Sequence, residues 1–127
     1  MKQKFSKHWK ASTQPRKQRK YRAKAPLHVI KRFLSANLSK DLRKKYGKRN
    51  LTLRKGDTVK VMRGKFRKKQ GKILEIKLKK QKVTIEGIQI TKKDGSKVNV
   101  RVQPSNLQIV ELNLADTKRI KSQQEKK

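Results

Sequence analysis

Short runs of apolar residues at every second position fill the middle of the chain, from residue 51 to residue 110. The alternating sets are Val59 and Val61; Leu74, Ile76 and Leu78; Val83 and Ile85; Ile88 and Ile90; Val98, Val100 and Val102; and Leu107 and Ile109. Predicted turns at 55–57, 63–65, 79–81, 93–95 and 104–106 separate these runs, and all but 79–81 contain Gly, Asp, Asn or Pro. A period of two directs successive side chains to opposite faces of a strand. Roughly five short strands in this segment predict a mainly β fold, a small antiparallel barrel.

The charge of the chain is the second constraint. Forty Lys and Arg residues stand against eight Asp and Glu, which gives a formal net charge of +32. The hydrophobic fraction is 31%, below the roughly 45–50% of an ordinary globular protein. Repulsion on this scale opposes compaction unless counter-anions surround the chain. The charge therefore favours a polyanionic partner, and nucleic acid is the leading candidate.

The charge is unevenly distributed along the chain. Residues 1–49 hold eighteen Lys and Arg but one acid, Asp41, whereas residues 50–110 hold seventeen cations and four acids. We therefore expect three parts: a basic RNA-threading extension over 1–49, a β-barrel over 50–112 and a polar C-terminal tail over 113–127.

The first 25 residues show no hydrophobic period. Such a segment buries too little surface to offset its ordering entropy, so we expect it to be disordered alone and extended on RNA. Its aromatic residues Phe5, Trp9 and Tyr21 have no core to join, which favours stacking on bases or packing against a neighbouring protein over remaining mobile. The cations of the extension expected to bind RNA are Arg16, Lys17, Arg19, Lys20, Arg22, Lys24, Lys31 and Arg32.

Two short helices are predicted in the rest of the extension, near residues 27–34 and 39–46. Pro26 suits the start of the first, because its missing N–H costs little in a first turn. Ser39 can cap the start of the second, and Gly47 can end it.

The segment 54–73, R-K-G-D-T-V-K-V-M-R-G-K-F-R-K-K-Q-G-K-I, predicts a hairpin with a basic tip. Its structural positions are Gly56, Asp57, Val59, Val61, Gly64, Gly71 and Ile73. Gly64 permits a tight reversal or the close approach of another backbone. The residues expected at the RNA-binding tip and its exit are Arg63, Lys65, Phe66, Arg67, Lys68, Lys69 and Lys72. Phe66 fits two roles equally well, as a plug of the barrel or as a ring that stacks on a base.

This stretch resembles a KOW motif, the glycine-punctuated hairpin of small SH3-like barrels in ribosomal proteins and transcription elongation factors. Gly56, Gly64 and Gly71 occupy matching positions, while Lys68 stands where the motif often has another glycine. The flanking sequences A-P-L-H-V-I-K-R (25–32), L-S-K-D-L-R-K-K-Y-G-K-R-N (38–50) and V-Q-P-S-N-L (102–107) resemble a family of large-subunit ribosomal proteins. It is the archaeal and eukaryotic form of family L twenty-four, called L twenty-six in eukaryotic naming.

The resemblance runs from about residue 17 to residue 121 and implies a cytoplasmic location in the ribosome. It also implies binding near the 5′ end of the large-subunit rRNA, a role in early subunit assembly and a position near the exit of the peptide tunnel. Neighbouring ribosomal proteins, and nascent-chain or targeting-factor contacts, follow as expected partners.

No pattern in the sequence points to catalysis, a cofactor or a metal site. Cysteine is absent, and His8 and His28 are too far apart for a convincing metal site. No apolar run approaches the ~18–20 residues that would span a bilayer, so we expect no membrane insertion, and the first ten residues lack the apolar part of a secretory signal. The open alternatives are a KOW-domain transcription elongation or RNA-processing factor, a generic DNA compactor and, least favoured, a membrane-active protein.

Overall fold

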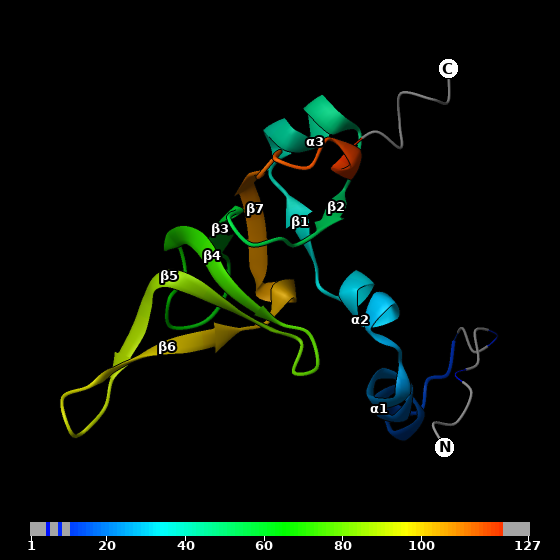
Figure 1. Ribbon diagram of the computed structural model, residues 1–127, viewed down its shortest axis with the longest axis horizontal. Helices are drawn as coiled ribbons and strands as arrows, with labels where there is room; N and C mark the ends of the chain where they lie inside the picture. Colours follow the sequence, from blue (N-terminus) through cyan, green and yellow to red (C-terminus); the bar gives the residue numbers. More distant parts are fainter. Residues whose placement is uncertain (1–4, 6–7, 9–10, 121–127) are drawn as a thin grey trace.

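The computed structural model describes residues 5, 8 and 11–120. These residues form a seven-stranded sheet with the order β2-β1-β7-β3-β4-β5-β6 (Figure 1). The strands are β1 Ser35–Leu38, β2 Asn50–Thr52, β3 Thr58–Val61, β4 Gln70–Lys77, β5 Lys82–Thr91, β6 Lys97–Val102 and β7 Leu107–Glu111. The helices are α1 Pro15–Lys24, α2 Leu27–Phe33 and α3 Lys40–Tyr46, with 3-10 turns η1 Pro104–Asn106 and η2 Thr117–Arg119. The predicted class, a mainly β barrel-like fold with short helices towards the N-terminus, is confirmed.

One strand pairing departs from the expected antiparallel arrangement. β1 pairs in parallel with β7, through Asn37 with Gln108 and Leu38 with Ile109, whereas its other neighbour β2 is antiparallel. β1 was not predicted, because it lies between two helical patterns in the basic segment and its pairing with β7 joins residues far apart in the chain. The sheet thus takes one strand from the segment that was expected to be extension.

The core is enclosed by the curved sheet. Val59 and Val61, which the alternation placed inside, are buried, and so is Ile73, a predicted structural position of the hairpin. The remaining core residues come from almost every strand and from the connections next to them: Leu34, Ala36, Leu38, Leu53, Val83, Ile85, Ile88, Val102, Leu107 and Ile109. Branched and aliphatic side chains from strands far apart in the sequence therefore hold the domain together.

The alternation fails in two places, each with a structural cause. Leu74 is 40% exposed because the β4–β5 register shifts between Ile73 and Glu75, which resets the faces of the strand. Ile90 and Val98 are 46% and 41% exposed, although they pair with each other across β5 and β6. Both lie near the turn that joins β5 to β6, and the end of the β5–β6 hairpin projects away from the rest of the sheet (Figure 1).

The two predicted helices form with the expected ends. α2 begins directly after Pro26. At the start of α3 the Ser39 hydroxyl oxygen accepts a hydrogen bond from the Leu42 N–H at 3.5 Å. Gly47 ends α3 in the left-handed conformation, with φ +62°, and its N–H donates to the Arg43 carbonyl. Local capping chemistry is therefore readable in this part of the sequence.

The expectation of a disordered or extended segment before residue 26 is wrong for Pro15–Lys24, which forms α1 (Figure 1). No residue of α1 is buried. The helix instead follows from local preference, since Gln, Lys, Arg and Ala are good helix formers and Pro15 occupies the first turn. Arg22 and Lys24 in the last turn also complement the negative end of the helix dipole.

The aromatic residues of this region pack on one another. The rings of Phe5 and Tyr21 lie 4.7 Å apart between centroids, and those of Tyr21 and Phe33 lie 6.0 Å apart. The expectation that Phe5 and Tyr21 have no partner within the chain is therefore wrong, because α2 supplies Phe33. The prediction for Trp9 lies outside the described residues.

Candidate nucleic-acid interface

The first group of candidate cations lies on α1. Arg16, Lys17, Arg19, Lys20, Arg22 and Lys24 are all exposed, and the helix contains no acidic residue. With about 3.6 residues per turn, these positions distribute positive charge over more than half of the helix circumference, and Gln18 and Tyr21 occupy the remaining sector. A helix of this kind contributes little to a core and presents a broad cationic face.

The second group lies on α2, which the core holds in place. Ile30 and the following Leu34 are buried, while Lys31 and Arg32 in the last turn are exposed. Apolar residues thus fix the helix to the sheet and leave its cations outside. Lys31 and Arg32 also line an open groove of about 400 Å³ together with His28, Lys118 and Arg54.

The third group lies on the β3–β4 loop, where Arg63, Lys65, Arg67, Lys68 and Lys69 are all exposed. The loop is ordered by its own backbone. The Val61 N–H donates to the Lys69 carbonyl at 2.9 Å, and the Lys68 N–H donates back to the Val61 carbonyl at 2.8 Å. Gly64 has φ +93° and open space around it, so it serves the reversal and not a close approach. Lys72, on β4, is also exposed.

Lys68 has φ +74°, a left-handed conformation that L side chains rarely adopt. The turn therefore keeps the backbone geometry for which a glycine is suited, although the residue is lysine. The departure from the KOW pattern at this position places a lysine in a left-handed conformation and adds one cation to the tip.

Phe66 is half-buried and packs against the core cluster. The Lys69 ammonium lies 5.3 Å from the centroid of the Phe66 ring. This placement supports the packing role over base stacking, because the core and the Lys69 side chain already contact the ring.

Gly71 explains how the hairpin meets the next strand. A Cβ at this position would lie 2.4 Å from the backbone oxygen of Glu86 and 2.9 Å from Cγ2 of Ile85. β4 and β5 therefore approach too closely for any larger residue. Gly71 pairs with Val59 across β3 and β4, so it also fixes the base of the loop.

Asp57 forms a buried ion pair with Arg119 that the sequence analysis did not foresee. Asp57 is 0% exposed, and the Arg119 side chain is 4% exposed. Arg119 Nη1 and Nη2 donate to Asp57 Oδ1 and Oδ2 at 2.6 and 2.5 Å. The N–H groups of Arg54 and Asn113 donate to the same carboxylate at 2.9 and 2.8 Å. A buried Asp implies a cationic partner, but forty candidates gave no means of choosing it.

A second ion pair lies beside the first. Arg54 Nη1 donates to Asp116 Oδ2 at 2.5 Å. The pKa of Asp116 is lowered by this hydrogen bond first and by the Lys118 N–H next. Two of the few acids in the chain are therefore used to tie residues 113–119 to the sheet, and their negative charge is already matched within the chain.

The structure thus gathers the sequence-predicted residues into separate groups, on α1, on α2 and on the β3–β4 loop. Among the described residues, no group of three or more His, Asp or Glu side chains is placed to bind a metal ion. Within that same part of the chain, every helix is too short or too polar to cross a membrane.

Comparison with known proteins places the chain in a family. Residues 12–126 match the model of the ribosomal proteins described as L26 in eukaryotes and L twenty-four P in archaea. The large ribosomal subunit protein uL24 of Methanocella arvoryzae is 48% identical over 115 residues, covering 91% of this chain and 93% of the relative. The proteins of the same name from Methanothrix thermoacetophila and Methanosarcina barkeri are 47% and 45% identical over 110 and 111 residues. Each alignment covers 87% of this chain, with 95% and 96% of the respective relatives. The chain therefore belongs to the ribosomal protein family that comprises eukaryotic L26 and its archaeal counterpart, L twenty-four P.

Proposed function

We propose that the chain is a structural component of the large ribosomal subunit and acts in the cytoplasm by binding rRNA. The observation that carries this proposal is the separation of charge in the fold. Asp57 and Asp116 are paired with arginines inside the chain, whereas the cations of α1, α2 and the β3–β4 loop are exposed. These three groups contain no acid, and cations at this density fit a polyanion. Family membership supports ribosomal RNA as that polyanion.

The three groups of cations contact the RNA in different ways. The ordered β3–β4 loop docks as a rigid unit, since its backbone is closed by the hydrogen bonds between Val61, Lys68 and Lys69. α1 and α2 extend from the sheet (Figure 1) and contact further RNA segments. Contacts to phosphates supply most of the affinity, and the shapes of the loop and the helices determine where the protein sits.

The more specific parts of the proposal follow from the family. The site lies near the 5′ end of the large-subunit rRNA, and binding there supports an early step of subunit assembly. The bound protein lies near the exit of the peptide tunnel, beside other ribosomal proteins and within reach of nascent chains and targeting factors. The names of three archaeal relatives support the assignment to the large subunit.

A salt titration of the full chain against purified large-subunit rRNA tests the mechanism. With about ten phosphates neutralised, affinity falls by several powers of ten between 50 and 200 mM salt. A slope near zero in the plot of log affinity against log salt would refute binding through phosphates. Cosedimentation with intact large subunits through high salt tests the structural role, because a transiently bound factor is washed off.

A further inference from the structure

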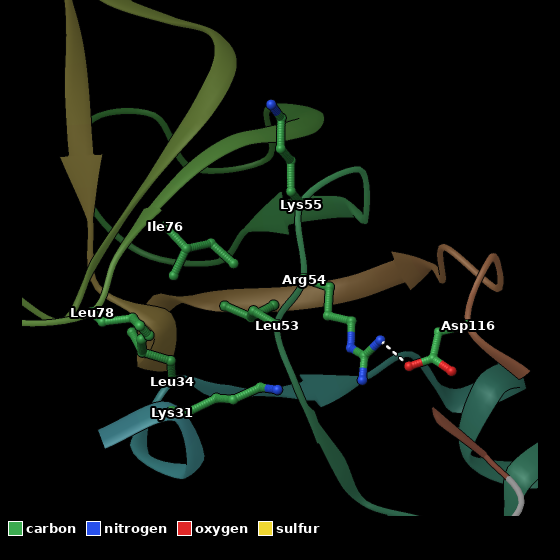
Figure 2. A pocket seen from close by; sticks show the side chains of 8 residues that line it. All are labelled: Lys31, Leu34, Leu53, Arg54, Lys55, Ile76, Leu78 and Asp116. Atoms are coloured by element: carbon green, nitrogen blue, oxygen red, sulfur yellow. Dashed lines mark hydrogen bonds and ion pairs between the residues drawn. The ribbon is translucent and has the colours of Figure 1, made fainter. Parts of the chain in front are cut away.

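A groove between α2 and the sheet has an apolar interior and cationic edges. Its volume is about 570 Å³. Leu34 and Leu53 form its floor, and the half-buried Ile76 and Leu78 line one side (Figure 2). An apolar hollow of this size on a surface otherwise dominated by lysine and arginine is not explained by phosphate contacts alone.

The Arg54–Asp116 ion pair neutralises part of the charge around this groove and leaves it positive. Three cations, Lys31, Arg54 and Lys55, and one carboxylate, Asp116, line it, which leaves two positive charges in excess. Arg54 is turned towards Asp116, and Lys31 extends across the groove towards Arg54, whereas Lys55 points away from it (Figure 2). Lys31 is therefore the cation best placed to meet an anion attached to whatever fills the apolar part.

The groove continues into the basic surface of α2. Lys31 and Arg54 also line the adjoining groove, where His28, Arg32 and Lys118 add further cationic or polar groups. A ligand with one flat apolar part and phosphates on either side of it would match this order of surfaces. An unpaired nucleotide has this form, because its base offers an apolar face and the RNA backbone carries phosphates on both sides.

We propose that the groove receives one unpaired, extruded nucleotide of the bound rRNA. The base lies over Leu53 and against Ile76 and Leu78, and Lys31 contacts its phosphate. The flanking RNA backbone follows Arg32 and Lys118 along α2. This inference rests on the proposed rRNA binding and adds to it a point at which the protein selects a single unpaired position.

Probing of RNA flexibility tests the proposal. The full chain is bound to purified large-subunit rRNA, and every 2′-hydroxyl is probed with an acylating reagent, which reports on all four nucleotides. The variant Ile76→Phe fills the groove, and Leu74→Phe adds the same ring to the exposed side of the same strand. Lys31→Gln removes the proposed phosphate contact. Because Lys31 is exposed, this variant should fold normally even if Ile76→Phe does not.

The native chain and Leu74→Phe should both protect one unpaired nucleotide. Ile76→Phe and Lys31→Gln should return it to the reactivity of free RNA, and Ile76→Phe should lower affinity by about 5- to 150-fold, the range expected for losing one stacked base. Equal reactivity patterns for Ile76→Phe and Leu74→Phe would overturn the nucleotide site while leaving the wider footprint intact. In intact large subunits, crosslinks from the groove residues to a ribosomal protein and not to rRNA would also overturn the nucleotide site. A native chain without any footprint would contradict the proposed function as well.

Discussion

The sheet and α1 both carry exposed cations, but only the sheet is stabilised by a buried apolar core. In the sheet, Val59, Ile73, Ile85 and Ile109 are almost completely buried, and lysines occupy the outer positions. In α1 every side chain lies outside the core, and cations cover more than half of the helix circumference. The sheet therefore derives its stability from its own apolar burial, while the exposed cations of α1 are expected to contribute to phosphate contacts in the proposed RNA complex. We therefore expect the stability of the fold and the affinity for RNA to depend on different segments of the chain.

The largest expected effect on stability comes from the buried ion pair. Asp57→Ala leaves the Arg119 guanidinium buried without its partner, so the free energy of unfolding should fall by about 3–5 kcal/mol. Urea unfolding followed by circular dichroism measures this loss. Removal of both partners in the double variant with Arg119→Ala should cost less than the sum of the two single changes.

A matched exposed carboxylate provides the control for that experiment. Asp94→Ala removes an acid whose hydrogen bonds go to Ser96 in its own turn, so stability should change by less than about 1 kcal/mol. Equal losses for Asp57→Ala and Asp94→Ala would contradict the view that the sheet depends on its internal ion pair.

The next effect concerns α1 and should appear in binding alone. Replacing its six Lys and Arg residues by Gln removes six cations but keeps a good helix former at each position. The slope of log affinity against log salt should fall by about 4–5, with the urea midpoint of the sheet unchanged.

A barrel that loses its cooperative unfolding in this α1 variant would break the comparison. A salt slope unchanged from the native chain would break it in the other direction, since α1 would then contribute nothing to binding. Helical content measured with the free variant shows whether the substitution itself has altered α1.

Local patterns in the sequence were enough to predict much of the fold. Period-two alternation identified β3 to β7, and Ser39 and Gly47 identified the ends of α3. The missed elements lack such patterns. α1 has no apolar period, because it buries nothing, and β1 forms through a parallel pairing with β7, a strand from the other end of the domain.

The candidate site shows the same division between local and long-range information. The exposed cations of the β3–β4 loop follow from a short motif, and their exposure needs no distant partner. The Asp57–Arg119 pair and the groove of Lys31, Leu53 and Ile76 join segments far apart in the chain. Only tertiary structure brings such residues together, so no local spacing indicates them.

A smaller loss of stability is expected at the base of the KOW hairpin. Gly71→Ala places a Cβ against the Glu86 backbone, where no flexible side chain can move aside. The free energy of unfolding should fall by about 1–3 kcal/mol. Thermal unfolding measures the change, with the exposed neighbour Gln70→Ala as the control. Similar midpoints for the two variants would show that β4 and β5 can separate without cost.

The smallest effect tests whether stability and binding can be separated within a single residue. Lys68→Gly and Lys68→Ala remove the same charge from the tip, so both should lower the salt slope by about one. Only glycine suits the left-handed φ of +74°, so Lys68→Gly should be more stable than Lys68→Ala by about 1 kcal/mol. Parallel urea unfolding and rRNA titrations of the two variants measure both quantities. If the glycine variant were the less stable, backbone strain at this position would be negligible; if the slopes differed, the loop conformation itself would control phosphate contact. The expected outcome would mean that the charge of Lys68 contributes to RNA affinity, whereas its backbone conformation affects the stability of the barrel.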